Sequence, residues 1–104
     1  MLTTMLGLAA TAALSAQQPA NGAALYAKTC ASCHGPHGTP AAGMARAMGV
    51  PNFGVPATLA GLSDGVLRAT VENGKGRMMP SYKSRLSPAE IAAVVAYIRT
   101  LSKH

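Results

Sequence analysis

The chain has 104 residues, which is enough for one domain. Only 12% of its residues are charged and 49% are hydrophobic, so the composition excludes a highly charged disordered chain. Nine basic and three acidic residues give a formal net charge of +6. This charge alone permits nucleic-acid binding, but the sequence offers no basic helix or aromatic platform, and we expect no nucleic-acid partner.

The first segment has the character of an export signal. An apolar run of mostly small residues, from Met5 to about Ala16, is too short to span a bilayer and suits the hydrophobic part of a signal peptide. Small residues at 13–16 offer a cleavage site, although no Lys or Arg precedes the run. We therefore expect a signal peptide at 1–16, a domain at 20–104, no membrane span and a periplasmic location.

Two helices are predicted in the first part of this domain. Asn21 or Gly22 can open the first, which runs through AALYAKTCASC until Gly35 and Pro36 break it. The Gly- and Pro-rich stretch 37–61 is expected to be a loop with one helical turn at AAGMARAM. The second helix, DGVLRATVEN, is capped by Ser63 and ended by Gly74. Its apolar side has helical spacing and comprises Val66, Leu67, Thr70 and Val71.

The last helix has the clearest signals. In SPAEIAAVVAYIRTLSK, Ser87 is the expected N-cap, Pro88 takes the first helical position and Glu90 completes a capping box. One apolar stripe follows, made of Ile91, Val94, Val95, Ile98 and Leu101. Because no segment alternates as a strand does, we expect an all-α fold of about three to four helices.

Both cysteines of the chain lie in the stretch CASCH, at Cys30 and Cys33, and His34 follows directly. The pattern C-x-x-C-H is the attachment signature of a c-type haem. Its two thiols form thioethers with the two vinyl groups, and positions three apart share one side of a helical turn. The imidazole of His34 then binds the iron from one face. The predicted cofactor is one covalently attached haem c.

Three other interpretations of this stretch stay open. A thioredoxin-like redox pair needs a βαβ setting that the pattern lacks. A zinc site could use the two thiols, His34 and His37, but no second ligand pair lies a loop away. The cysteines could also be inert members of the core.

The other face of the iron needs a ligand, and Met79, directly before Pro80, is the candidate. A thioether is a soft, neutral ligand, and the proline holds the preceding residue in an extended conformation. The rival methionines are Met44, Met48 and Met78. His37 lies too close to His34 to reach the far face, and His104 is a chain-end residue that we expect to be solvated.

With these motifs, the chain resembles the class I monohaem cytochromes c of the compact bacterial type, from about Asn21 to Leu101. The resemblance rests on CASCH, on Met79-Pro80 followed by an aromatic residue, and on three helix residues, which are Gly22, Tyr26 and Tyr97. It implies a small cytochrome c fold wrapped around the haem, in which Gly22 meets the face that carries Tyr97. It also implies a proline carbonyl, from Pro51 or Pro40, as acceptor for the proton of the haem-binding imidazole.

If both axial positions are filled, the iron can only change its oxidation state, so we expect a soluble electron carrier and not an enzyme. The alternatives are a peroxidase-like haem enzyme or gas sensor with an open sixth position, and an electron-entry subunit of a larger dehydrogenase or oxidase. We expect a monomer that docks redox proteins, acidic ones in particular, near Lys75, Arg77, Lys83 and Arg85. Since the haem supplies core area, we expect the haem-free chain to be mostly unfolded.

Overall fold

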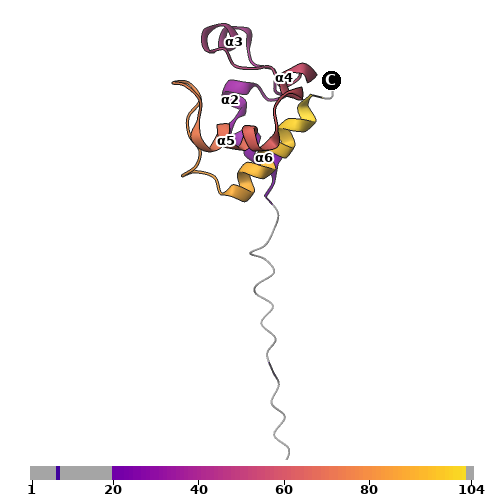
Figure 1. The fold of residues 1–104 in the computed structure, drawn as a ribbon, viewed down its shortest axis with the longest axis vertical. Coiled ribbons are helices and arrows are strands. Elements are labelled where there is room, and N and C mark those ends of the chain that lie inside the picture. The colour runs from indigo at the N-terminus through magenta and orange to yellow at the C-terminus, as the bar shows by residue number, and fades with distance from the viewer. Residues whose placement is uncertain (1–6, 8–19, 103–104) are drawn as a thin grey trace, which may run out of the picture.

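The computed structural model describes Gly7 and residues 20–102 of the chain. The expected signal peptide and His104 therefore lie outside the described residues, apart from Gly7. Across 20–102 the fold is all-helical, as predicted, and an isolated bridge is the sole β-type pairing described (Figure 1). Its six helices are α1 (Gly22–Thr29), α2 (Ala31–His34), α3 (Ala42–Met48), α4 (Pro56–Ala60), α5 (Asp64–Asn73) and α6 (Pro88–Leu101).

Six helices exceed the expected three to four because two of them are very short. Cys30 ends α1 and begins α2, so the first predicted helix is divided at the first cysteine. Helix α4, with five residues and Pro56 in its first turn, arises inside the predicted loop. Pieces of this length contain too few residues for a helical period to be visible in the sequence. The predicted turn at AAGMARAM, by contrast, is α3.

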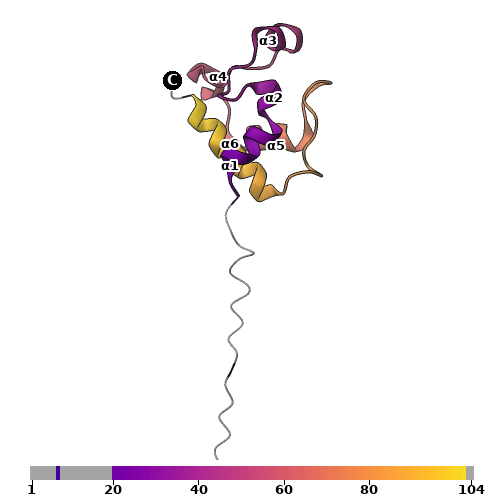
Figure 2. The same cartoon turned by 180° about the vertical axis from the view of Figure 1, so that it is seen from behind.

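The terminal helices pack across each other through Gly22 (Figure 2). A Cβ atom at this position would lie 2.2 Å from the carbonyl oxygen of Ala93 and 3.2 Å from the Cβ of Tyr97. Tyr26 packs beside this crossing, with its ring centroid 5.2 Å from that of Tyr97 and the rings tilted by 57°. The implied meeting of Gly22 with the Tyr97 face is therefore confirmed.

The core consists of two clusters of buried side chains, and α6 contributes to both. The larger cluster contains Tyr26, Phe53, Leu59, Leu67, Val94, Val95, Ile98 and Leu101. The smaller contains Val71, Tyr82, Leu86 and Ile91, with Leu25 and Met79 packed against it. All five residues of the predicted α6 stripe are buried, as expected for the core face of an amphipathic helix.

The start of α6 has the predicted capping box. The Ser87 hydroxyl accepts a hydrogen bond from the Glu90 amide at 3.1 Å, and the Glu90 carboxylate accepts one from the Ser87 amide at 2.9 Å. None of the described helices combines the length and the apolar character needed to cross a bilayer.

Near its other end, α6 carries an anchor that the sequence did not predict. The Arg99 guanidinium donates to the Asp64 carboxylate at 2.8 Å and to the Leu59 carbonyl at 3.0 Å. A third hydrogen bond goes to the carbonyl of Leu62. One side chain thus holds the corner between α4 and α5 against α6, and this corner forms part of a pocket wall.

Candidate functional site

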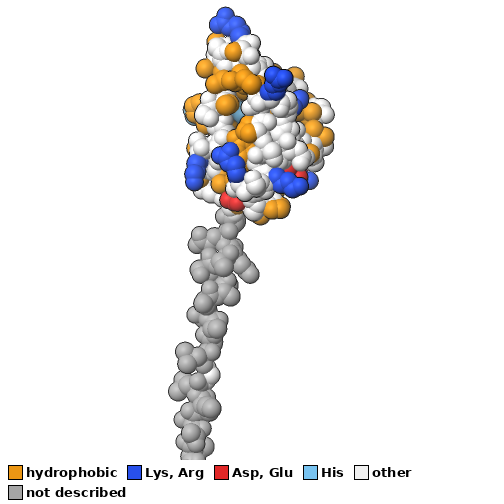
Figure 3. All heavy atoms as spheres, turned by 90° about the vertical axis from the view of Figure 1, so that its left-hand side faces the viewer, with side chains coloured by type: hydrophobic (Ala, Val, Ile, Leu, Met, Phe, Trp, Pro, Cys, Tyr) orange, Lys and Arg blue, Asp and Glu red, His pale blue; other side chains and the backbone are white. Residues whose placement is uncertain are grey.

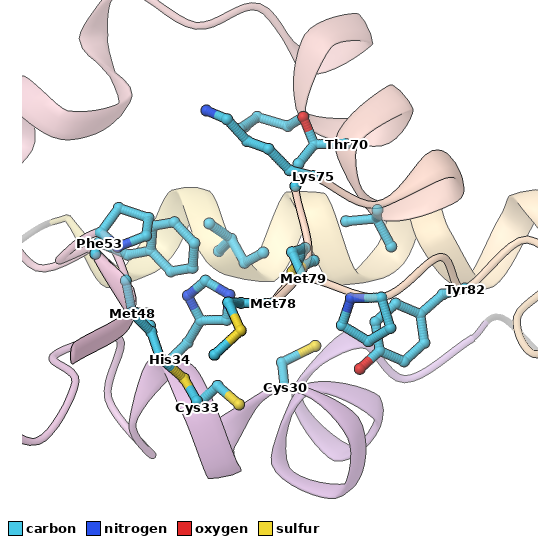
Figure 4. A pocket seen from close by; sticks show the side chains of 18 of the residues that line it. Cys30, Cys33, His34, Met48, Phe53, Thr70, Lys75, Met78, Met79 and Tyr82 are labelled. Carbon is cyan, nitrogen blue, oxygen red and sulfur yellow. The ribbon is translucent and has the colours of Figure 1, made fainter. Parts of the chain in front are cut away.

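A pocket of about 410 Å³ opens between the α1–α2 segment, α5 and the loop that follows α5 (Figure 4). This volume is within the range of about 300–1,000 Å³ that is typical of ligand and cofactor pockets. The lining is mostly apolar and comes from residues 29–34, 48–53, 58–71 and 75–82, with Ile98 of α6. Side chains far apart in sequence therefore surround one cavity.

The predicted attachment residues meet at this pocket. Cys30, Cys33 and His34 all line it, and the two cysteines are free rather than joined as a disulfide. The break between α1 and α2 at Cys30 still leaves a turn of helix over 31–34, so both thiols reach one cavity. Figure 4 shows these three side chains near one another on the α2 side of the pocket.

The thiol of Cys30 and the imidazole of His34 are both half-buried, and this burial favours their neutral forms. Burial raises the pKa of the Cys30 thiol to about 11 and lowers the pKa of His34 below its usual value. A neutral imidazole is the form that binds a metal. Among the described residues there is no group of three His, Cys, Asp or Glu side chains arranged to hold a metal ion.

The expected proline acceptor for His34 is not found. Nδ1 of His34 is buried and has no hydrogen-bond partner within the described part of the chain, so neither Pro51 nor Pro40 plays this role here. The ring of His34 instead stacks on the ring of Phe53, with centroids 4.6 Å apart and planes 13° from parallel. This stack covers a face of the imidazole, whereas an acceptor for Nδ1 would lie in the plane of the ring.

The two candidate methionines lie on the loop after α5, and both line the pocket. Met79 exchanges two backbone hydrogen bonds with Lys75, of 3.0 and 3.2 Å, and its side chain packs against the smaller core cluster. Met78 is 53% exposed. Gly74 begins the loop with φ +76°, and a Cβ atom there would lie 2.5 Å from the Met79 carbonyl oxygen. The loop is therefore anchored at Met79 rather than at Met78.

Of the rival methionines, Met48 lines the pocket and Met44 does not. The α5 side chains named from helical spacing, 66, 67, 70 and 71, all line it. Phe53 and Thr58 are lining residues that the sequence analysis missed. The one signal for Phe53 is that it is the sole phenylalanine of the chain, set within a Gly- and Pro-rich stretch.

The charged residues that line the pocket are both basic, Lys75 and Arg77. Lys83 and Arg85, the other two predicted docking residues, are exposed on the following segment, and Arg85 lies over the Tyr82 ring at 4.7 Å from its centroid. Figure 3 shows Lys and Arg side chains around apolar ones on this face of the molecule. The face combines an apolar hollow with a basic rim.

The chain is similar to known proteins. The model of the family described as "Cytochrome C oxidase, cbb3-type, subunit III" matches residues 17–98. The chain belongs to this family. A cbb3-type cytochrome c oxidase subunit CcoP from Rubrivivax gelatinosus is 40% identical over 74 residues, which are 71% of this chain and 23% of that protein. Its counterpart from Rhodobacter capsulatus is 38% identical over 87 residues, covering 77% and 28%. The chain thus spans about a quarter of the length of these relatives.

Among solved structures, the KustC0563 c-type cytochrome is similar, with a TM-score of 0.74 and 30% identity over 80% of this chain and 99% of that one. The family and this likeness confirm the resemblance to class I monohaem cytochromes c and the all-helical cytochrome c fold. A member of the cbb3-type subunit III family with this fold is an electron-transfer domain, and its cofactor is haem c. The two cysteine thiols, the His34 imidazole and the methionine side chains around one apolar pocket fit a haem c group.

Proposed function

We propose that Cys30 and Cys33 attach the haem, that His34 and Met79 bind its iron, and that the domain at 20–104 carries one electron. The observation that carries the proposal is that all four side chains line one pocket although they lie in segments far apart in sequence. The iron has no open position in this arrangement, so the haem exchanges electrons and carries out no bond-making step. This supports a carrier over a peroxidase-like enzyme or a gas sensor.

Covalent attachment is tested by unfolding the protein in acid and extracting it with organic solvent. The haem should stay with the chain in the wild type. It should be held by a single bond in Cys30→Ala and in Cys33→Ala, and be fully extractable in the double variant. A wild-type haem that extracts completely would contradict attachment at both cysteines.

The sixth ligand is tested by the visible spectrum of the reduced protein with and without carbon monoxide. Wild type and Met78→Ala should keep an unchanged six-coordinate spectrum, whereas Met79→Ala should bind carbon monoxide rapidly. Met79 is favoured because its backbone is anchored and its side chain is half-buried, whereas that of Met78 is largely exposed. Carbon monoxide binding by Met78→Ala alone would identify Met78 as the sixth ligand. Binding by the wild type would contradict methionine ligation and favour the alternatives with an open sixth position.

We further propose that redox proteins dock at the face that carries the haem pocket. Lys75 and Arg77 lie at the pocket itself, where positive charge attracts an acidic partner and raises the association rate. Electron-transfer rates with an acidic partner should fall with rising salt, and fall further in Lys75→Gln with Arg77→Gln. Arg68→Gln is the matched control, because Arg68 is exposed but does not line the pocket. A flat salt response, or an equal loss in the control, would remove this docking face.

The family relationship also favours a second role, as an electron-entry subunit of an oxidase, because the matched relatives are oxidase subunits. We propose that the domain works on the periplasmic side after export by the segment 1–16, and that it is a monomer when alone. Purification of the untagged protein from its own cells separates the two roles. A free carrier elutes at the size of one chain, whereas a subunit elutes with a membrane-bound oxidase. N-terminal sequencing of either form tests removal of the signal.

A further inference from the structure

The corner between α4 and α5 forms one wall of the pocket. Thr58, Leu62 and Val66 line the pocket from this corner. The corner residues that do not line it, 60, 61 and 63–65, are exposed and add little packing to hold the wall. A segment with few buried contacts opens locally at a low cost in free energy. The contacts that tie the corner to the rest of the fold therefore decide how firmly the wall is closed.

The side chain of Arg99, on α6, ties the corner down at three points. Its guanidinium donates to the Leu59 carbonyl at 3.0 Å, to the Leu62 carbonyl, and to the Asp64 carboxylate at 2.8 Å. These acceptors belong to α4, to the turn and to the first residue of α5. The other hydrogen bonds described for residues 59–66 join positions within four of one another. The hydrogen bonds that connect this corner to α6 thus all come from one side chain.

A guanidinium suits this task better than an ammonium does. It is a planar fork of five N–H donors in fixed directions, whereas the ammonium of lysine is a point charge on a flexible stem. Figures 1 and 2 both show α4 beside the C-terminal end of α6, the end that carries Arg99. The preceding residue, Ile98, lines the pocket and is 5% exposed. Neighbouring residues of α6 therefore contribute to the pocket in two ways, Ile98 as a lining side chain and Arg99 through the corner.

From this geometry we propose that Arg99 is a positioning residue that clamps the α4–α5 corner and thereby keeps water from the haem on this side of the pocket. The inference rests on the proposed function, in which the pocket holds a haem that carries one electron. Oxidised haem iron has one more positive charge than reduced haem iron, so contact with water favours the oxidised state. A closed wall therefore raises the reduction potential, since burial is one means by which a protein sets it.

The test measures the midpoint reduction potential of the haem-loaded protein in a matched pair of variants. Arg99→Lys keeps the positive charge but loses the fork. Arg68→Lys makes the same change at an exposed residue of α5 that does not line the pocket. The potential should fall in Arg99→Lys and stay as in the wild type in Arg68→Lys. A wild-type potential in Arg99→Lys, or an equal shift in both variants, would overturn the proposal.

A double-variant comparison tests whether Arg99 acts through the wall. Leu62→Ala shortens a side chain of the wall directly and should itself lower the potential. If Arg99 acts by holding this wall, Arg99→Lys should lower the potential less in the Leu62→Ala background than in the wild type, because the two changes affect one feature. Full additivity of the two shifts would contradict the proposed route.

A measurement on the wild type covers the case in which Arg99→Lys does not assemble. In the haem-loaded protein, the Nε proton of Arg99 should exchange with water more slowly than that of Arg68, because it is bonded to Asp64. Equal exchange rates would exclude the clamp. Failure of the proposed function looks different. The wild type would then release its haem on extraction or bind carbon monoxide when reduced, whatever residue stands at position 99.

Discussion

Gly74 is the position at which one methyl group should displace the proposed Met79 ligand. With φ of +76° and ψ of −178°, the residue lies in a region that only glycine adopts readily, so Gly74→Ala costs about 1–3 kcal/mol in backbone strain. The new Cβ would also lie 2.5 Å from the Met79 carbonyl oxygen and 2.9 Å from the Pro80 carbonyl carbon. Both contacts involve backbone atoms, so no change of side-chain rotamer can relieve the clash. The segment 79–80 must therefore move.

Two measurements separate strain from ligand loss. Denaturant unfolding of Gly74→Ala should show a loss of at least about 1–3 kcal/mol, and the reduced variant should bind carbon monoxide, which the wild type should not. Gly76→Ala is the matched control, since Gly76 also has a positive φ, +58°, but a Cβ atom there meets nothing within 4 Å. It should lose about 1–2 kcal/mol and stay inert to carbon monoxide. If Gly74→Ala stays inert as well, the reasoning from the contact of Gly74 with Met79 is refuted.

Two further predictions concern the stability of the haem-loaded protein, measured by denaturant unfolding. Arg99→Met should lose about 1–3 kcal/mol because two carbonyls, the part-buried one of Leu59 and the exposed one of Leu62, lose hydrogen bonds worth about 0.5–1.5 kcal/mol each. Asp64→Asn should lose less than about 1 kcal/mol because that ion pair is largely exposed. Equal losses would contradict the assignment. Gly22→Ala should lose about 1–3 kcal/mol by forcing α1 from α6, whereas Gly43→Ala, with open space around it, should lose nothing.

The features that sequence predicted well depend on residues close together in the chain. The CASCH stretch, the Ser63 cap and the Ser87 capping box each involve partners within four positions, so the chemistry and the local geometry follow from spacing alone. The crossing at Gly22 was reached through the family resemblance, because nothing in the local pattern indicates which helix it meets.

The features that sequence missed depend on contacts between distant segments. The hydrogen bonds of Arg99 reach back 35 to 40 positions, and the stack of Phe53 on His34 joins a loop to a helix. The choice of Met79 over Met78 remains a prediction, which the anchored loop backbone supports and the carbon monoxide experiment decides.

The pairing of the terminal helices has a consequence for the order of events during biogenesis. The segment with both thiols belongs to the first part of the domain to be synthesised, whereas α6, which α1 packs against and which contributes Ile98 to the pocket, is the last. Closing the contact of Tyr26 with Tyr97 requires nearly the whole domain. Until α6 arrives, one wall of the pocket is missing and the thiols stay accessible. The topology thus leaves an interval in which Cys30 and Cys33 can receive the haem before Ile98 completes the wall of the pocket.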